Sequence, residues 1–157
     1  MNRTLIAMVA CGIAIGTYEG AASIADASTS PHITTISFVE HETSDQSFHL
    51  GPKAGVAVGY VELAANNDMQ GNKKIGRDGG TCVITRLSGG TADDLCNVVF
   101  MLAGGQVDAN GLVTSTPSGP GTFTIAIVGG TGLYSGARGE VTTVPAQSPK
   151  ITLRITG

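Results

Sequence analysis

The sequence predicts an all-β protein: one eight-stranded antiparallel up-and-down barrel of the calycin or lipocalin kind. Three observations favour this fold. The 157 residues suffice for one domain and are too few for two with separate cores. Glycine is abundant at 23 residues and charged residues make up only 13%, which favours short strands and tight turns over amphipathic helices. From Ile33 onward, apolar or alternating runs are separated by turn-forming residues.

The N-terminal segment has the pattern of a secretory signal peptide. A basic start is followed by an apolar run from Thr4 to Gly16, which is too short to span a bilayer, and then by small residues. We expect cleavage after Ala27, or alternatively after Ala22; a buried N-terminal helix is the competing interpretation. Residues 1–27 are therefore predicted to be removed, which leaves residues 28–157 as one secreted or otherwise extracytoplasmic domain without a membrane span.

Eight candidate strands follow the signal segment. They are 33–42, 55–66, 80–88, 94–104, 105–116, 121–130, 137–146 and 150–157. No stretch among them keeps a 3.6-residue apolar period over three turns, so we expect few helices. Mostly short connections favour an up-and-down barrel, in which closure removes the exposed sheet edges. A β-sandwich is the competing architecture.

The first two strands carry the candidate polar and aromatic site residues. In 33–42, alternation places Phe38, Glu40 and Glu42 on one face. Two carboxyls beside an aromatic ring indicate either a solvent-facing edge or an inward face, where each would need a partner or a raised pKa. Tyr60, in the next strand, is expected to line a ligand cavity or to fill the core.

The third and fourth strands form a candidate hairpin around Gly89. Cys82 and Cys96 are equally distant from that glycine, so they would lie opposite each other on one face. An even pair of cysteines in an oxidising compartment favours a disulfide. The alternative is that both are small apolar core residues.

The strand 94–104 is apolar on both faces. One face carries Cys96 and Phe100, the other Leu95, Val99 and Met101. A solvated outer face should be polar. We therefore expect one face to line the lumen, where Phe100 contacts a ligand or fills the core, and the other to contact a protein surface in a homo-oligomer.

The late strands surround a glycine-rich stretch that looks like a phosphate loop. The segment "FTIAIVGGTGLYSGARGEV" starts as a dinucleotide-binding strand does, but Gly136 and Gly139 interrupt the helix that such a site requires. The chain ends before a βαβ unit could be completed. We expect Gly129 to Gly132 to form a tight connection between two antiparallel strands.

Charge and histidine spacing exclude other partners. The formal net charge is −3 and the chain has no basic run beyond Lys73-Lys74, so no nucleic acid is expected. His32, His41 and His49 lack a metal-ligand spacing, so no metal is expected.

Three sequence blocks resemble the barrel domain of allene oxide cyclases and the related dirigent proteins, most closely exported bacterial members. They are "IAIVGGTGLYSGARGEV", "NKKIGRDGGTCVITRL" and "GQVDANGL", and they occur in the right order. The resemblance covers about Ile33 to Gly157. It implies an eight-stranded barrel, often trimeric, whose lumen binds an apolar small molecule without a cofactor.

The resemblance also assigns site residues. Glu40 matches the first-strand glutamate of the cyclases, Asn66 matches the second-strand asparagine that helps hold a bound water, and Cys82 matches their strand cysteine. Glu40 and Asn66 are the expected catalytic residues. Glu42 departs from the family pattern, in which that position is a second asparagine, and a Cys82–Cys96 bridge would remove a free thiol.

The expected function is that of an exported small-molecule-binding barrel acting as a cofactor-independent cyclase or isomerase. The substrate would be apolar, derived from a fatty acid or a polyketide, and folded into a reactive shape by the lumen. The expected substrate contacts are Phe38, Glu42, Tyr60, Cys82 and Phe100. The alternative is a non-catalytic ligand-binding or dirigent-type scaffold, since fold does not determine function.

Overall fold

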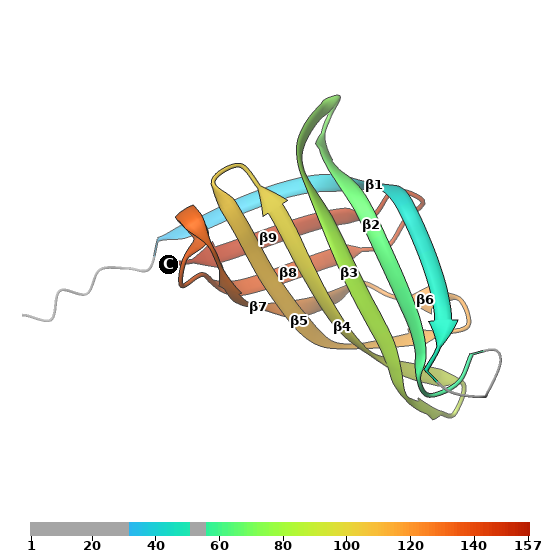
Figure 1. Cartoon of the computed structure of the whole chain (residues 1–157). Helices are drawn as coiled ribbons and strands as arrows, with labels where there is room; N and C mark the ends of the chain where they lie inside the picture. Colours follow the sequence, from blue (N-terminus) through green and yellow to red (C-terminus); the bar gives the residue numbers. More distant parts are fainter. Residues whose placement is uncertain (1–31, 51–55) are drawn as a thin grey trace, which may run out of the picture.

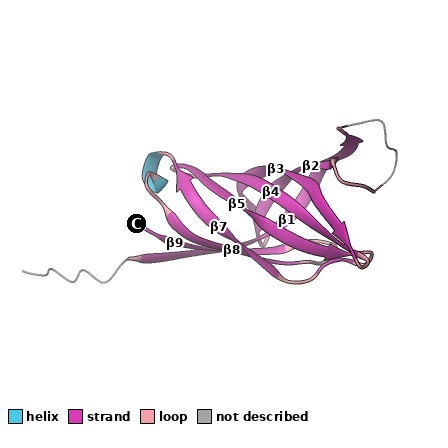
Figure 2. Cartoon of the chain, turned by 90° about the horizontal axis from the view of Figure 1, so that it is seen from below, coloured by secondary structure: helices cyan, strands magenta, loops and turns pink. Residues whose placement is uncertain are grey.

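The computed structural model describes residues 32–50 and 56–157, and within these ranges the chain is almost entirely β-sheet. The predicted signal peptide lies outside the described residues. Figure 1 shows the strands wrapped around one lumen, and Figure 2 shows the same barrel from below. Within the described ranges, no helix has the length and apolar character of a membrane-spanning segment.

Consecutive strands pair antiparallel around the barrel. The strands are β1 (Ile33–His49), β2 (Tyr60–Gln70), β3 (Lys73–Ser88), β4 (Thr91–Leu102), β5 (Gly105–Thr116), the short β6 (Gly119–Pro120), β7 (Phe123–Gly130), β8 (Arg138–Val144) and β9 (Lys150–Thr156). The ladder β4-β3-β2-β1-β9-β8-β7-β5 is closed by pairing of β4 with β5. This order confirms the eight-stranded up-and-down barrel, with β6 as a two-residue addition.

The inner face holds the hydrophobic core. Phe100 on β4, Val107 on β5 and Leu153 on β9 each expose 1% or less of their surface. The alternation expected for β4 is confirmed, because Cys96 and Phe100 are buried while Leu95, at 44% exposed, faces outward. Closure therefore buries one face of each strand, as a small barrel filled by its own side chains requires.

β1 and β3 are longer than the sequence predicted, and β2 lies further along the chain than the predicted strand 55–66. The prediction ended the first strand at 42, began the second at 55 and began the third at 80, but β1 runs to His49 and β2 and β3 form one long hairpin. The hairpin turns at Gly71, whose φ of 56° suits glycine. The stretch "NDMQGNKKIGRDG", predicted to be a connection, thus supplies two strand ends, and its hairpin extends past the neighbouring strands (Figure 1).

The glycine-rich stretch is a turn between β7 and β8, as expected. It contains one short 3-10 helix, Gly132–Tyr134, and it packs directly on the β4–β5 hairpin. A Cβ on Gly105 would lie 2.0 Å from the Thr131 carbonyl oxygen, and one on Gly132 would lie 2.1 Å from that of Gly104. These glycines allow two backbones to touch, and they serve the fold rather than a phosphate.

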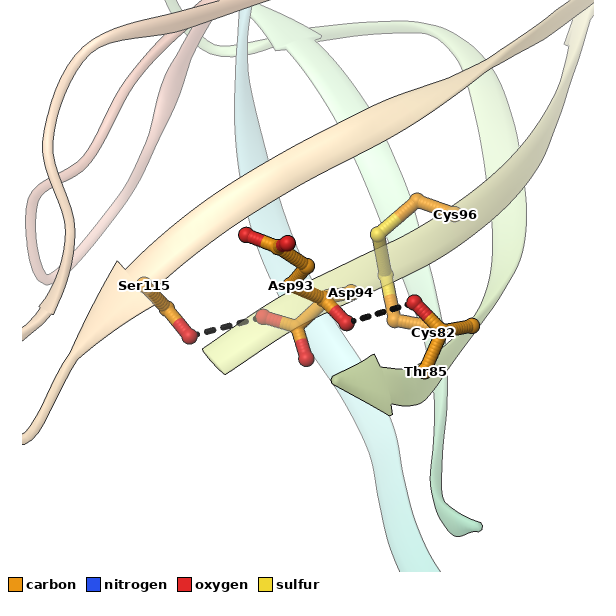
Figure 3. The surroundings of a disulfide bond; sticks show 6 residues. All are labelled: Cys82, Thr85, Asp93, Asp94, Cys96 and Ser115. Carbon is orange, nitrogen blue, oxygen red and sulfur yellow. Dashed lines mark hydrogen bonds between the residues drawn. A yellow bond between two sulfur atoms is a disulfide. The ribbon is translucent and has the colours of Figure 1, made fainter. Parts of the chain in front are cut away.

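Cys82 and Cys96 form the predicted disulfide. They are register partners on β3 and β4, with Cα atoms 4.1 Å apart. Figure 3 shows the bridge beside Asp94 and Ser115. The bridge therefore joins two neighbouring strands on the inner face of the barrel.

Candidate functional site

Four polar side chains come together on the inner face of β1, β2 and β3. Glu40 is the register partner of Asp68, and Asn66 is the register partner of Asp78. The Asn66 Nδ2 atom donates a hydrogen bond of 2.8 Å to Asp78 Oδ1. Because register partners place their side chains side by side, three carboxyls and one amide share one small region. We call Glu40, Asn66, Asp68 and Asp78 the carboxyl cluster.

The cluster is deeply buried. Asp68 is fully buried and Asp78 is 7% exposed. Both carboxyl oxygens of Asp68 and the Oδ2 atom of Asp78 lack a hydrogen-bond donor among the described residues. A buried ionised carboxylate without a donor is very costly, so protons shared between the carboxyls must supply the missing donors.

The electrostatics of the cluster agree with shared protons. Burial raises the pKa of Glu40 to about 8, and the charge of Asp78 and a hydrogen bond with it add to the rise. Burial also raises the pKa of Asp68 to about 8, helped by the hydrogen bond and charge of Asp78 and by the charge of Glu40, while Lys74 opposes the rise. At neutral pH the cluster thus holds protons that ordinary carboxyl groups would have lost.

Two aromatic rings cover the cluster. Phe100 is the register partner of Asp78 on β4, and its ring packs edge to face on Phe38 with centroids 5.9 Å apart. Both rings are buried. This apolar cover lowers the local dielectric, which is what keeps the carboxyls protonated.

A cavity of about 890 Å³ opens at the end of the barrel formed by the β3–β4 hairpin. Its walls include Tyr60, Glu62, Cys82, Asp94 and Phe123. Its size is that of a pocket for a drug-sized molecule. Two of the predicted substrate contacts, Tyr60 and Cys82, therefore lie on this cavity.

Small side chains separate the cavity from the carboxyl cluster. Along β3, the inward positions run from Cys82 at the cavity through Gly80 to Asp78 in the cluster. The layer of Gly80 also contains Ala64 and Val98, its register partners on β2 and β4. Four residues along a strand correspond to about 13 Å. The partly apolar cavity and the buried carboxyl cluster thus lie at two levels of one barrel, and Gly80 packs against Val98 between them.

The remaining predicted site residues fall into two groups. Phe38, Phe100, Glu40 and Asn66 lie in or against the cluster. Glu42 is the register partner of Asn66 but is exposed, and the β1 register shifts directly after it. Asp68 and Asp78 were missed: alternation from Asn66 places Asp68 on its face, but Asp78 comes opposite Asn66 only through the register shift between Asp68 and Met69.

Such a cluster can carry out general acid–base chemistry. A protonated carboxyl can give a proton to a substrate while its ionised neighbour removes one, provided that their environments hold their pKa values apart. Among residues 32–50 and 56–157, no group of three His, Cys, Asp or Glu side chains is arranged to hold a metal ion. The carboxyl and amide groups of the cluster can themselves transfer protons and form hydrogen bonds.

Several solved structures share the fold. A pyocyanin demethylase is 28% identical with a TM-score of 0.69, and the match covers 78% of this chain and 100% of that one. The Diels-Alderase AbmU from Streptomyces koyangensis is 14% identical, with a TM-score of 0.60 and coverage of 83% and 70%. A pterocarpan synthase dirigent protein is 16% identical, with a TM-score of 0.57 and coverage of 80% and 84%.

The sequence also matches a family of barrel domains. A comparison with curated proteins gave no match. Residues 38–156 match the family described as allene oxide cyclase barrel like domain, and this span includes the whole carboxyl cluster and all but the start of β1. The chain therefore belongs to the allene oxide cyclase barrel like domain family.

Proposed function

We propose that this barrel binds an apolar small molecule in its lumen and catalyses a cofactor-independent proton-transfer reaction on it, a cyclisation or an isomerisation. The observation that carries the proposal is Asp68, which is fully buried, has no hydrogen-bond donor among the described residues, and lies beside two further carboxyls. Buried charged groups can often be replaced by apolar ones without loss of stability. A purely structural barrel has no use for such a cluster.

The residues divide the work as follows. Phe38 and Phe100 hold the apolar body of the substrate near the cluster and exclude water. Glu40 and Asp68, which keep their protons at neutral pH, donate to a substrate oxygen or nitrogen, and Asp78 lies beside them as a further carboxyl. Asn66 orients Asp78 through its hydrogen bond. The solved neighbours, which include a Diels-Alderase and dirigent proteins, support a barrel that shapes small molecules.

Binding and turnover are tested separately. The neutral fluorophore N-phenyl-1-naphthylamine should bind the purified protein and be displaced by candidate polyketide-derived or fatty-acid substrates. Displacing substrates are then followed for product formation in D2O by mass spectrometry, which reports both rearrangement and solvent proton transfer. We expect Glu40→Gln and Asp78→Asn to keep fluorophore affinity within about threefold and to lower turnover at least 100-fold.

Two outcomes would contradict the proposal. Failure of the fluorophore to bind would show that the lumen is closed to small molecules. Turnover that is unchanged in both variants would remove the cluster from the chemistry. Binding without any proton transfer in the wild type would instead favour the non-catalytic scaffold.

We also propose that the barrel forms a homo-oligomer, a trimer by family resemblance, through an apolar outer face. Leu95, Val99, Leu112 and Val128 on β4, β5 and β7 are each at least 40% exposed. A shallow outer groove of about 500 Å³ lies beside them, lined in part by Gly79 and Val99. Light scattering after gel filtration should show that Leu112→Glu lowers the assembly state while Arg154→Glu does not.

Export and loss of residues 1–27 complete the proposal. The Cys82–Cys96 disulfide supports it, because such bridges persist in oxidising compartments. The mass of the protein recovered from its source measures the cleavage position. A full-length cytoplasmic product would contradict export.

A further inference from the structure

The inner and outer faces of the barrel differ sharply in charge. Every lysine and arginine among the described residues is exposed. Glu40, Asp68 and Asp78, by contrast, lie inside the barrel at the cluster, and Glu62 and Asp94 line the cavity. Carboxyl groups therefore lie both in the cluster and in the cavity, and no lysine or arginine is among the described residues that line the cavity.

Glu62 and Asp94 both line the cavity, and their charges interact. Burial raises the pKa of Glu62, and the charges of Asp94 and Asp45 raise it further. Asp94 accepts a hydrogen bond of 2.7 Å from Ser115 and lies beside the disulfide (Figure 3). A fixed carboxyl with a second one across an apolar cavity repels an incoming anion and attracts a cation.

The walls between these carboxyls suit the body of an organic cation. Tyr60 and Phe123 supply aromatic surface, and Ile84 and Val113 supply aliphatic surface. An aromatic face attracts a cation through its quadrupole, and more strongly where water is excluded. Deeper in the lumen, Asp68 adds a buried carboxyl that has no basic side chain hydrogen-bonded to it among the described residues.

We propose that the ligand of this lumen is an organic cation or a protonated amine on an aromatic or apolar body, whose charged nitrogen binds between Glu62 and Asp94. The body then lies along the cavity walls and points past Ala64 and Gly80 toward the carboxyl cluster. The inference rests on the proposed function, because it requires a lumen that admits small molecules. A free fatty-acid carboxylate is the ligand class that this lumen disfavours.

Three isosteric bicyclic probes test the charge preference directly. They are 1-methylquinolinium, 1-methylnaphthalene and 1-naphthoate, which carry charges of +1, 0 and −1. Their affinities for the purified protein are measured by equilibrium dialysis at low ionic strength and neutral pH. We expect the cation to bind at least tenfold more tightly than the neutral probe, and the anion to bind more weakly than either.

Matched variants locate the charge preference. Asp94→Asn keeps an oxygen that can accept from Ser115, and Glu62→Gln keeps the size of its side chain. The double variant should bind the cation at least tenfold more weakly and leave the affinity of the neutral probe within twofold, while Glu140→Gln, on the exposed outer face of β8, changes neither. Circular dichroism verifies that each variant is folded.

The outcomes separate this inference from the proposed function. If the neutral probe binds as tightly as the cation, or if the double variant keeps the full preference, the cation site is wrong although the lumen still binds small molecules. If none of the three probes binds and the fluorophore also fails, the proposed function is wrong as well.

Discussion

Replacement of Asp68 by asparagine should remove much of the pH dependence of stability. The Asp68 carboxyl has a pKa of about 8 in the folded chain, against 3.8 when it is free of the fold. Below pH 3.8 it is protonated in both states, and between 3.8 and about 8 only the folded state keeps the proton. The Asp68 proton therefore stabilises the folded state fully below pH 3.8, and this stabilisation is lost progressively as the pH rises to about 8.

The structure sets the size of the effect. The folded and free pKa values of Asp68 differ by about four units, and each unit corresponds to about 1.4 kcal/mol. The largest possible change in the free energy of unfolding is therefore about 6 kcal/mol. Glu40 and Asp78 share protons with Asp68, so part of this free energy belongs to them. We therefore expect about 3 kcal/mol for Asp68 itself.

Urea denaturation followed by far-ultraviolet circular dichroism at pH 5, 7 and 9 measures this difference. Between pH 5 and pH 9, the free energy of unfolding of the wild type should fall by about 2 kcal/mol more than that of Asp68→Asn, because part of the loss already occurs below pH 5. The exposed Glu140→Gln is the control, and its pH dependence should follow the wild type. Equal slopes for Asp68→Asn and the wild type would show that Asp68 ionises normally and refute the shared-proton interpretation.

Three further stability predictions follow from the fold. Replacing Cys82 and Cys96 together by alanine removes a disulfide between residues 14 positions apart, and it should lower the free energy of unfolding by about 3 kcal/mol. Denaturant midpoints equal to those of the wild type would contradict this. Gly105→Ala places a Cβ against the Thr131 carbonyl and should cost at least 2 kcal/mol, whereas Gly121→Ala, with nothing within 4 Å, should cost under 1 kcal/mol. Phe100→Ala should cost about 3–5 kcal/mol by calorimetry, and a loss under 1 kcal/mol would mean that the lumen collapses around the gap.

The sequence predicted the fold because its signals are local. Alternation in 94–104 and glycines at the turns were enough for strand identity and for the disulfide. The polar stretch 67–79 was misassigned, because its composition is that of a connection. The register of β1, β2 and β3 is set by how the strands pair. The residue pattern within one strand therefore could not show that Glu40 lies opposite Asp68.

The barrel separates the residues that stabilise it from those that can react. The core cluster draws its buried apolar side chains from β1, β4, β5, β7, the β7–β8 turn, β8 and β9. The inward positions of β2 and β3 between Glu62 and Cys82 are instead polar or small. Unpaired buried polar groups reduce stability, and they persist where function requires them.

This division predicts how the two halves of the barrel respond to substitution. Large-to-small changes in β5, β7, β8 and β9 create cavities and reduce stability, whatever their effect on chemistry. Amide replacements of Asp68 or Asp78 remove a buried ionisable group, so they should preserve or increase stability while turnover falls. A variant that loses activity as it gains stability is the signature expected of a residue kept for chemistry, and β2 and β3 are where such variants should be found.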